Sequence, residues 1–113
     1  MLANDAASGF SALGNTSRLH IFRFLVRAGS DGVAIGTIQQ HLSMPLSTLA
    51  HHLNMLVKAD LILQEKIGRQ VICRANFEQM EELVGFLTEN CCSGINSAGK
   101  EADNALRDQE ITL

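Results

Sequence analysis

Hydrogen-bonding side chains alternate with leucines between residues 46 and 56 of this chain. The leucines recur at helical spacing, which predicts a helix with one apolar face. The side chains between them carry hydroxyl, imidazole and amide groups and almost no charge: Ser47, Thr48, His51 and Asn54. Such groups can read base edges in a DNA major groove, whereas in an isolated helix they would more simply form a solvated face. His52 falls nearer the leucines, so we expect it to pack and hydrogen-bond within the fold.

The residues on either side of this helix favour base contact. A turn is predicted at Ser43-Met44, because a residue before proline is pushed out of the helical region and Pro45 suits a helix start. After the helix, a β-hairpin is predicted around residues 67–70, with Arg69 at its tip. That position would let an arginine reach the minor groove or a phosphate. The predicted DNA-binding set is therefore the polar face and the hairpin arginine: Ser47, Thr48, His51, Asn54 and Arg69.

A second set of reactive groups is the adjacent pair Cys91-Cys92, which precedes a plausible helix stop at Ser93-Gly94. Neighbouring residues on a helix diverge by about 100°, but in a fraying last turn both sulfurs can converge on one soft ion. Two thiolates are too few for tetrahedral zinc and suit trivalent arsenic or antimony better. Two ordinary thiols near a chain end are the simpler alternative. Cys73 lies in an alternating strand pattern and is expected to be a small buried hydrophobe.

These groups are positioned by a predicted series of helices with one hairpin. Asn15-Thr16 offers a cap for the helix that Gly29-Ser30-Asp31-Gly32 ends. Apolar residues recur with helical or alternating periods elsewhere. The remaining predicted elements are a weak helix at 5–13 near a dimer interface, helices at 35–42 and 45–59, strands at 61–66 and 71–75, and a closing helix at 77–90.

The composition fits a small domain that binds duplex DNA. The chain has 113 residues, 46% of them hydrophobic, which suits one domain that a dimer interface would help to stabilise. Only 4% are aromatic, without Trp or Tyr, so stacking on single-stranded bases is disfavoured.

Charge is divided along the chain, although the net charge is −3. Residues 14–74 hold seven arginines and lysines against three acids, whereas residues 75–113 hold two against eight. Because phosphate affinity depends on local charge, we expect the basic part to face DNA and the acidic part to face away.

Three stretches of the sequence resemble the bacterial ArsR/SmtB family of dimeric, metal- or stress-responsive repressors. They are Ala12-Leu13-Gly14-Asn15-Thr16-Ser17-Arg18-Leu19-His20-Ile21, Ser47-Thr48-Leu49-Ala50-His51-His52-Leu53-Asn54-Met55-Leu56, and Gly68-Arg69-Gln70. The resemblance covers about residues 6–92 and implies a mainly α-helical winged helix-turn-helix with a small β wing, forming a homodimer on a palindromic operator. It divides the chain into a DNA-binding and dimerisation domain at 1–92 and a polar tail at 93–113.

The sensing sites of this family can be compared residue by residue. The Cys-x-Cys pair of its founding arsenic sensors corresponds to Ala34 and Gly36, so that site is absent. Its zinc sensors use Asp and His on the closing helix, where residues 77–90 contain no histidine. A subset carries a cysteine pair at the end of that helix and responds to trivalent arsenicals, sometimes with a third cysteine in the tail. Because residues 93–113 contain no cysteine, the resemblance favours a monomethylated or aromatic arsenical at Cys91 and Cys92.

Other functions remain open at this point. The cysteines could respond to oxidants or persulfides, or the protein could regulate DNA without any ligand. An enzyme is not expected, because no nucleophile, base and acid are recognisably spaced and no glycine-rich phosphate loop occurs. We expect no constitutive cofactor. No apolar run approaches a membrane span and the first residues lack a secretion signal, so a cytoplasmic location with reduced cysteines is predicted.

Overall fold

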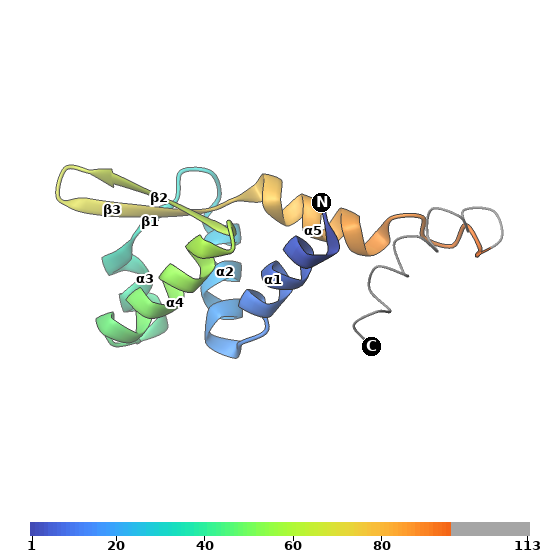
Figure 1. The fold of residues 1–113 in the computed structure, drawn as a ribbon. Coiled ribbons are helices and arrows are strands. Elements are labelled where there is room, and N and C mark those ends of the chain that lie inside the picture. Colours follow the sequence, from blue (N-terminus) through green and yellow to red (C-terminus); the bar gives the residue numbers. More distant parts are fainter. Residues whose placement is uncertain (96–113) are drawn as a thin grey trace.

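The computed structural model describes residues 1–95, which form a helical domain with a three-stranded sheet along one side (Figure 1). Its layout is the winged helix-turn-helix expected from the sequence. α3 and α4 form the helix-turn-helix, and the β2–β3 hairpin is the wing. The elements are α1 (Ala3–Leu13), α2 (Thr16–Ala28), β1 (Val33–Ala34), α3 (Ile35–Leu42), α4 (Leu46–Lys58), β2 (Ile62–Ile67), β3 (Gln70–Ala75) and α5 (Phe77–Thr88).

Local signals set the start of α2, the end of α3 and the start of α4. Asn15 caps α2, because its side-chain oxygen accepts a hydrogen bond from the Arg18 backbone N–H at 3.0 Å. α3 ends at Ser43, whose φ of 49° lies in the left-handed region. Pro45 is then the extended N-cap of α4. The predicted turn before Pro45 is therefore confirmed, and the predicted bounds of α4 are correct to within one residue at each end.

The sheet has the strand order β1-β3-β2, with both pairs antiparallel. In the wing, Ile62 pairs with Ala75 and Ile67 with Gln70, which leaves Gly68 and Arg69 as the turn. The predicted hairpin is confirmed, although β2 is shifted by one residue and β3 begins one residue earlier. β1 was not predicted, because a strand of two residues is too short to show an alternating pattern.

The core lies where α2, α4 and the sheet meet. One face of α4 contributes Leu49, Leu53 and Leu56, which are at most 1% exposed, and α2 contributes Ile21 and Leu25. Fully burying a leucine stabilises the fold by about 1.5–3 kcal/mol, so this leucine face holds α4 firmly in place. The Cys73 side chain is fully buried in the same core, which confirms that it is a small core residue.

α5 packs on α1 and leads away from the wing (Figure 1). Only Leu83 of this helix is buried, against Gly9 of α1. A Cβ atom at Gly9 would lie 3.0 Å from the Leu83 side chain, so the absence of a side chain permits the close approach. Phe77, Met80 and Phe86 are partly buried against the core, whereas Val84 and Leu87 are 57% and 68% exposed.

The predicted end of the closing helix is wrong by two residues. α5 ends at Thr88 rather than Asn90, and the Thr88 hydroxyl donates to the Val84 carbonyl at 3.0 Å. The chain then turns, and Asn90 and Cys92 adopt positive φ angles of 59° and 64°. Cys91 and Cys92 therefore follow the helix and do not form its last turn. Most of the predicted polar tail at 93–113 lies outside the described residues.

Gly32 permits the close contact between β1 and β3, and its replacement tests the sheet. Its φ is 72°, and an added Cβ would lie 2.6 Å from the Cys73 carbonyl oxygen. We expect Gly32→Ala to lower the free energy of unfolding by about 2 kcal/mol or more in urea denaturation, since left-handed strain alone costs about 1–2 kcal/mol. Gly36→Ala is the matched control, because its Cβ would meet nothing within 4 Å. Equal stability of the two variants would contradict this account of the β1–β3 contact.

Candidate nucleic-acid interface and thiol site

The polar face of α4 points to solvent. Ser47, Thr48, His51 and Asn54 are all exposed, while the leucine face of the same helix is buried. No acidic residue occurs in α2, α3 or α4. The exposed face of α4 therefore presents hydrogen-bonding groups without negative charge, as a surface that approaches DNA requires.

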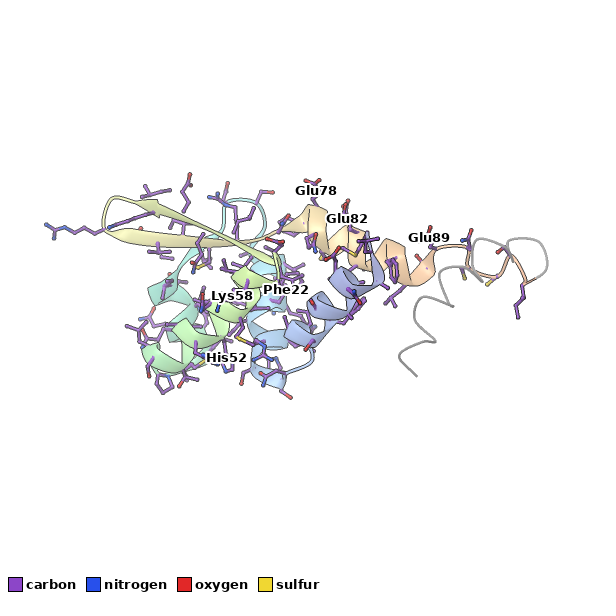
Figure 2. All side chains as sticks on the ribbon, viewed as in Figure 1. Phe22, His52, Lys58, Glu78, Glu82 and Glu89 are labelled. Atoms are coloured by element: carbon purple, nitrogen blue, oxygen red, sulfur yellow. The ribbon has the colours of Figure 1, made fainter. Side chains whose placement is uncertain are left out.

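Lys58 extends this polar face and was missed in the sequence analysis. It follows Ser47 and His51 by eleven and seven residues, which places the three side chains on one side of the helix. Its side chain is exposed (Figure 2). The spacing in the sequence could have identified it. A cation at this point can contact a phosphate beside the groove that the earlier residues would enter.

His52 lies partly buried beside the polar face, as predicted. Its Nδ1 is 3.4 Å from an Nη atom of Arg18, and its ring centroid is 5.8 Å from that of His51. Burial, then the neighbouring Arg18 and His51, lower the pKa of His52. The imidazole is therefore neutral at physiological pH, so its Nδ1 can accept a hydrogen bond from the Arg18 guanidinium.

Arg69 is exposed at the tip of the wing, where the hairpin prediction placed it. Between the wing and the helix-turn-helix lies an open groove of about 650 Å³. Arg69 and Gln70 line one side, and Thr37 and Gln40 of α3 line the other. The structure thus brings the wing arginine and the start of α4 to the same groove.

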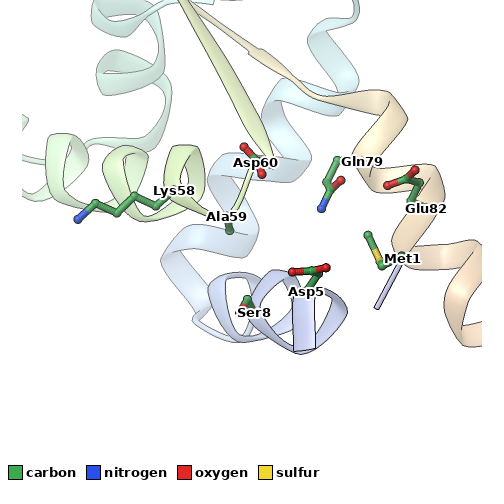
Figure 3. A pocket seen from close by; sticks show the side chains of 8 residues that line it. All are labelled: Met1, Asp5, Ser8, Lys58, Ala59, Asp60, Gln79 and Glu82. Atoms are coloured by element: carbon green, nitrogen blue, oxygen red, sulfur yellow. The ribbon is translucent and has the colours of Figure 1, made fainter. Parts of the chain in front are cut away.

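A polar hollow of about 410 Å³ separates α5 from the end of α4 (Figure 3). Asp5 of α1, Asp60 and Glu82 of α5 line it, and Lys58 extends away from it. Within residues 1–95 no three His, Cys, Asp or Glu side chains come together closely enough to hold a metal ion. Asp60, which lines the hollow, also belongs to the turn that is hydrogen-bonded to the start of α5.

Asn76 makes that connection at the start of α5. Its side-chain Nδ2 donates to the Asp60 carbonyl at 2.8 Å, and its backbone N–H donates to the Leu61 carbonyl at 2.9 Å. Its Oδ1 also caps α5 by accepting from the Gln79 N–H at 3.4 Å. One residue therefore joins the first turn of α5 to the turn that ends α4.

The two adjacent thiols converge although they lie outside the helix. The Sγ atoms of Cys91 and Cys92 are 2.9 Å apart, and both residues are exposed. The Cys91 N–H donates to the Thr88 carbonyl at 2.9 Å, which helps to shape the turn. The hydrogen bond with Cys92 is the main cause that raises the pKa of the Cys91 thiol. The raised pKa favours the protonated form of the Cys91 thiol, and the short distance between the two sulfurs would let one soft atom bind both.

Acidic side chains gather on α5 in the described part of the chain, and the expectation that this side faces away from DNA stays a prediction. Glu78, Glu82 and Glu89 lie along α5 and just beyond it, whereas His52 and Lys58 lie on α4 (Figure 2). Within the described part of the chain, the ion pair between Arg74 and Glu65, at 3.3 Å, is on the wing. Glu82 of the acidic helix borders the same hollow as Lys58 at the end of α4.

No helix within residues 1–95 combines the length and apolar character needed to cross a membrane.

The fold and the exposed helix face define a DNA-binding regulator, and comparison with known proteins identifies its family. A family model described as a helix-turn-helix domain matches residues 13–65. The HTH-type transcriptional regulator YbzH of Bacillus subtilis is 31% identical over 90 residues, covering 69% of this chain and 90% of its own length. The chain belongs to the HTH-type transcriptional regulators, and it is a regulator rather than an enzyme.

Solved structures support the same fold. The ArsR-like transcriptional regulator from Rhodococcus sp. RHA1 superposes with a TM-score of 0.64 and 22% identity, covering 97% of this chain and 93% of that one. The homodimeric winged helix-turn-helix DNA-binding domain Mb0332 from Mycobacterium bovis gives a TM-score of 0.62 and 24% identity, covering 77% and 81% of the two chains. The architecture is therefore that of the ArsR-like regulators.

The hydrogen bond between the thiols predicts a measurable change in reactivity. Replacing Cys92 with alanine removes the main cause of the raised pKa of Cys91, so the pKa should fall and more thiolate should be present at pH 7.5. We expect faster alkylation of Cys91 by iodoacetamide, followed by peptide mass spectrometry. Buried Cys73 serves as the internal control and should react slowly in both proteins. Slower alkylation of Cys91 in the variant would contradict the thiol–thiol contact.

Proposed function

We propose that this protein is a homodimeric transcriptional repressor that leaves its operator when a trivalent arsenical bridges Cys91 and Cys92. The observation that carries the proposal is the convergence of two exposed sulfurs just beyond α5, a helix whose first residues are hydrogen-bonded to the end of α4. The thiol pair is thus connected to α4, the helix proposed to read DNA, through α5 and the hydrogen bonds of Asn76. Reduced thiols are required, so we place the repressor in the cytoplasm.

DNA recognition is assigned to the exposed face of α4 and to the wing. Ser47, Thr48 and His51 lie toward the N-terminal end of α4, which in helix-turn-helix proteins enters the major groove. Asn54 follows on the same face, and its amide can bond an adenine edge. Arg69 would contact a phosphate or the minor groove from the wing. These roles agree with the exposure of all five side chains.

The dimer is supported by apolar surface on α5 and before α1. Leu2, Val84 and Leu87 are 74%, 57% and 68% exposed. Large apolar side chains that are this exposed on α5 and just before α1 favour association with a second copy. Mb0332, which shares the fold, is a homodimer. Because one recognition helix reads few base pairs, two copies related by a two-fold axis would bind an inverted repeat.

The chemistry of the thiol pair favours an organic arsenical over inorganic arsenite. An arsenical with one carbon substituent and two hydroxyl groups would form two As–S bonds with Cys91 and Cys92 and release two waters, the thiol protons leaving with the hydroxyl groups. Inorganic arsenite or antimonite bound to two thiolates would keep one hydroxyl group, which a third thiolate would have to replace. Cys73 is fully buried on β3 and does not supply that ligand in the described structure. Two soft ligands suit a soft centre of low coordination number.

Binding at the thiols can reach DNA through α5. Bridging the two sulfurs would reshape the turn after Thr88 and shift α5 and the dimer contacts it makes. Asn76 would pass the shift to the turn at Asp60-Leu61 and so to α4. Release requires only that the arsenical bind the DNA-free arrangement more tightly than the bound one, by a few kcal/mol.

The same sulfur–sulfur distance favours one alternative signal. An oxidant such as peroxide could remove two electrons and two protons from the pair and join the sulfurs, which would need to approach from 2.9 Å to about 2.05 Å. This vicinal disulfide would be reversed by a dithiol. If DNA were released by peroxide and not by arsenicals, the inducer would be an oxidant, and Cys91 and Cys92 would still be the sensing site.

The DNA assignment predicts different outcomes for α4 and the wing. We expect His51→Ala and Ser47→Ala each to weaken operator binding by about 1–3 kcal/mol per contact while leaving the fold intact. Arg69→Ala should weaken binding to every duplex and lower the salt slope. Fluorescence anisotropy with an operator selected from random duplexes measures both effects. Unchanged operator affinity in the His51 and Ser47 variants would refute the assignment of α4.

The switch predicts which cysteines matter. Cys91→Ser and Cys92→Ser each remove one of two soft ligands, so both variants should bind operator normally and stay bound when phenylarsine oxide is added. Cys73→Ser is the matched control and should release DNA as the wild type does. Loss of response in all three variants would indicate a three-thiolate site. Release of all three variants would exclude Cys91 and Cys92 as the sensor.

A further inference from the structure

Arg18 of α2 contacts both α1 and α4, close to the exposed polar face of α4 that is proposed to read DNA. It lies in the first turn of α2, where its backbone N–H is bound by the Asn15 cap. Its Nε donates to the Ala12 carbonyl at the end of α1, at 2.6 Å. Its Nη is 3.4 Å from Nδ1 of His52, in the middle of α4. The Arg18 side chain is partly buried, so these bonds are partly shielded from solvent.

The Ala12 carbonyl and the His52 ring bind different nitrogens of the planar guanidinium fork of Arg18, Nε and Nη respectively. The Ala12 carbonyl is one of the last in α1 and has no helical partner of its own. A neutral His52 ring accepts at Nδ1, and its low pKa keeps it in that state. A lysine has a single ammonium in place of the fork and cannot hold both acceptors in the same geometry.

We infer that Arg18 is a positioning residue for DNA recognition, which fixes the rotation of α4 relative to α1 through His52. The inference rests on the proposed function, in which α1 lies near the dimer contact and α4 reads DNA. His52 directly follows the proposed base-reading residue His51, and their rings are adjacent. A rotation of α4 that breaks the contact with Arg18 would therefore also move His51 relative to the groove.

A second polar contact, made by Asn76, acts together with the Arg18–His52 contact on α4. Asn76 holds the turn that ends α4, at Asp60. His52 and Asp60 are eight residues apart, which corresponds to about 12 Å along a helix. The buried leucine face already holds α4 against α2 and the sheet, and polar contacts at two separated points add directional restraints between α4 and its neighbouring helices. Arg18 connects α4 to α1, and Asn76 connects it to α5, so both helices proposed to form the dimer contact hold the reading helix.

The test is a double-mutant cycle measured on operator DNA. We expect Arg18→Lys and His52→Leu each to reduce operator affinity about tenfold, as loss of one hydrogen bond to a charged group would, with affinity for random duplex unchanged. Because both changes break the same contact, the double variant should lose no more than either single one. His52→Asn retains an acceptor and should recover most of the affinity. Arg23→Ala, an exposed arginine on the same helix, should leave the ratio of specific to random binding unchanged.

An NMR titration tests the contact without DNA. Replacing Arg18 with glutamine removes a positive charge beside His52, so the pKa of the imidazole should rise. Circular dichroism confirms that each variant is folded. Additive losses in the cycle together with an unchanged His52 titration would show that Arg18 only caps α1, and would overturn the inference. If the wild-type protein selected no duplex, the proposed function would fail, whereas the titration would still decide the Arg18–His52 contact.

Discussion

Burial of one face of α4 is the constraint on which the rest of this structure depends. Leu49, Leu53 and Leu56 fill the core between α2 and the sheet, and each is at most 1% exposed. A helix held by one apolar stripe has its opposite side chains fixed in direction. The polar face is therefore presented to solvent in one orientation. The same packing that stabilises the domain thus positions the groups proposed to read DNA.

That orientation must also be defined relative to a second copy of the chain. The core fixes α4 within one protomer, but in the proposed homodimer the spacing of the two recognition helices depends on how α4 is attached to α1 and α5, which are proposed to form the dimer contact. Two polar contacts make that attachment, through Arg18 to α1 and through Asn76 to α5. Polar contacts of this kind are directional, so a small movement of α5 can weaken one without unfolding the core. In the proposed switch, arsenical binding would change the polar contacts of α4 while the leucine core stays packed.

Features with strong local signals could be predicted from the sequence. Asn15 as a cap, Pro45 after a turn and the hairpin around Arg69 each depend on a few neighbouring residues, and all three are found in the structure. β1 was missed because two residues carry no period. The end of α5 was placed two residues late, because the helical pattern continues past Thr88 while the backbone turns.

Contacts between distant residues could not be predicted in this way. Arg18 and His52 are 34 positions apart, and only the crossing of α2 and α4 brings them together. The sequence placed His52 correctly on the inner side of its helix but gave no indication of its partner. The convergence of the two thiols was proposed for a fraying helix end. It is found instead in a turn where Cys92 has a positive φ.

The most direct test of the account is a titration of the wild-type protein bound to its selected operator. Phenylarsine oxide is added while fluorescence anisotropy reports bound DNA and a thiol assay on the same samples reports free cysteines. The account predicts that DNA is released in step with the loss of two accessible thiols per protomer, complete at one arsenic per protomer. DNA that stays bound after both thiols are consumed would contradict the claim that the pair controls the reading helix.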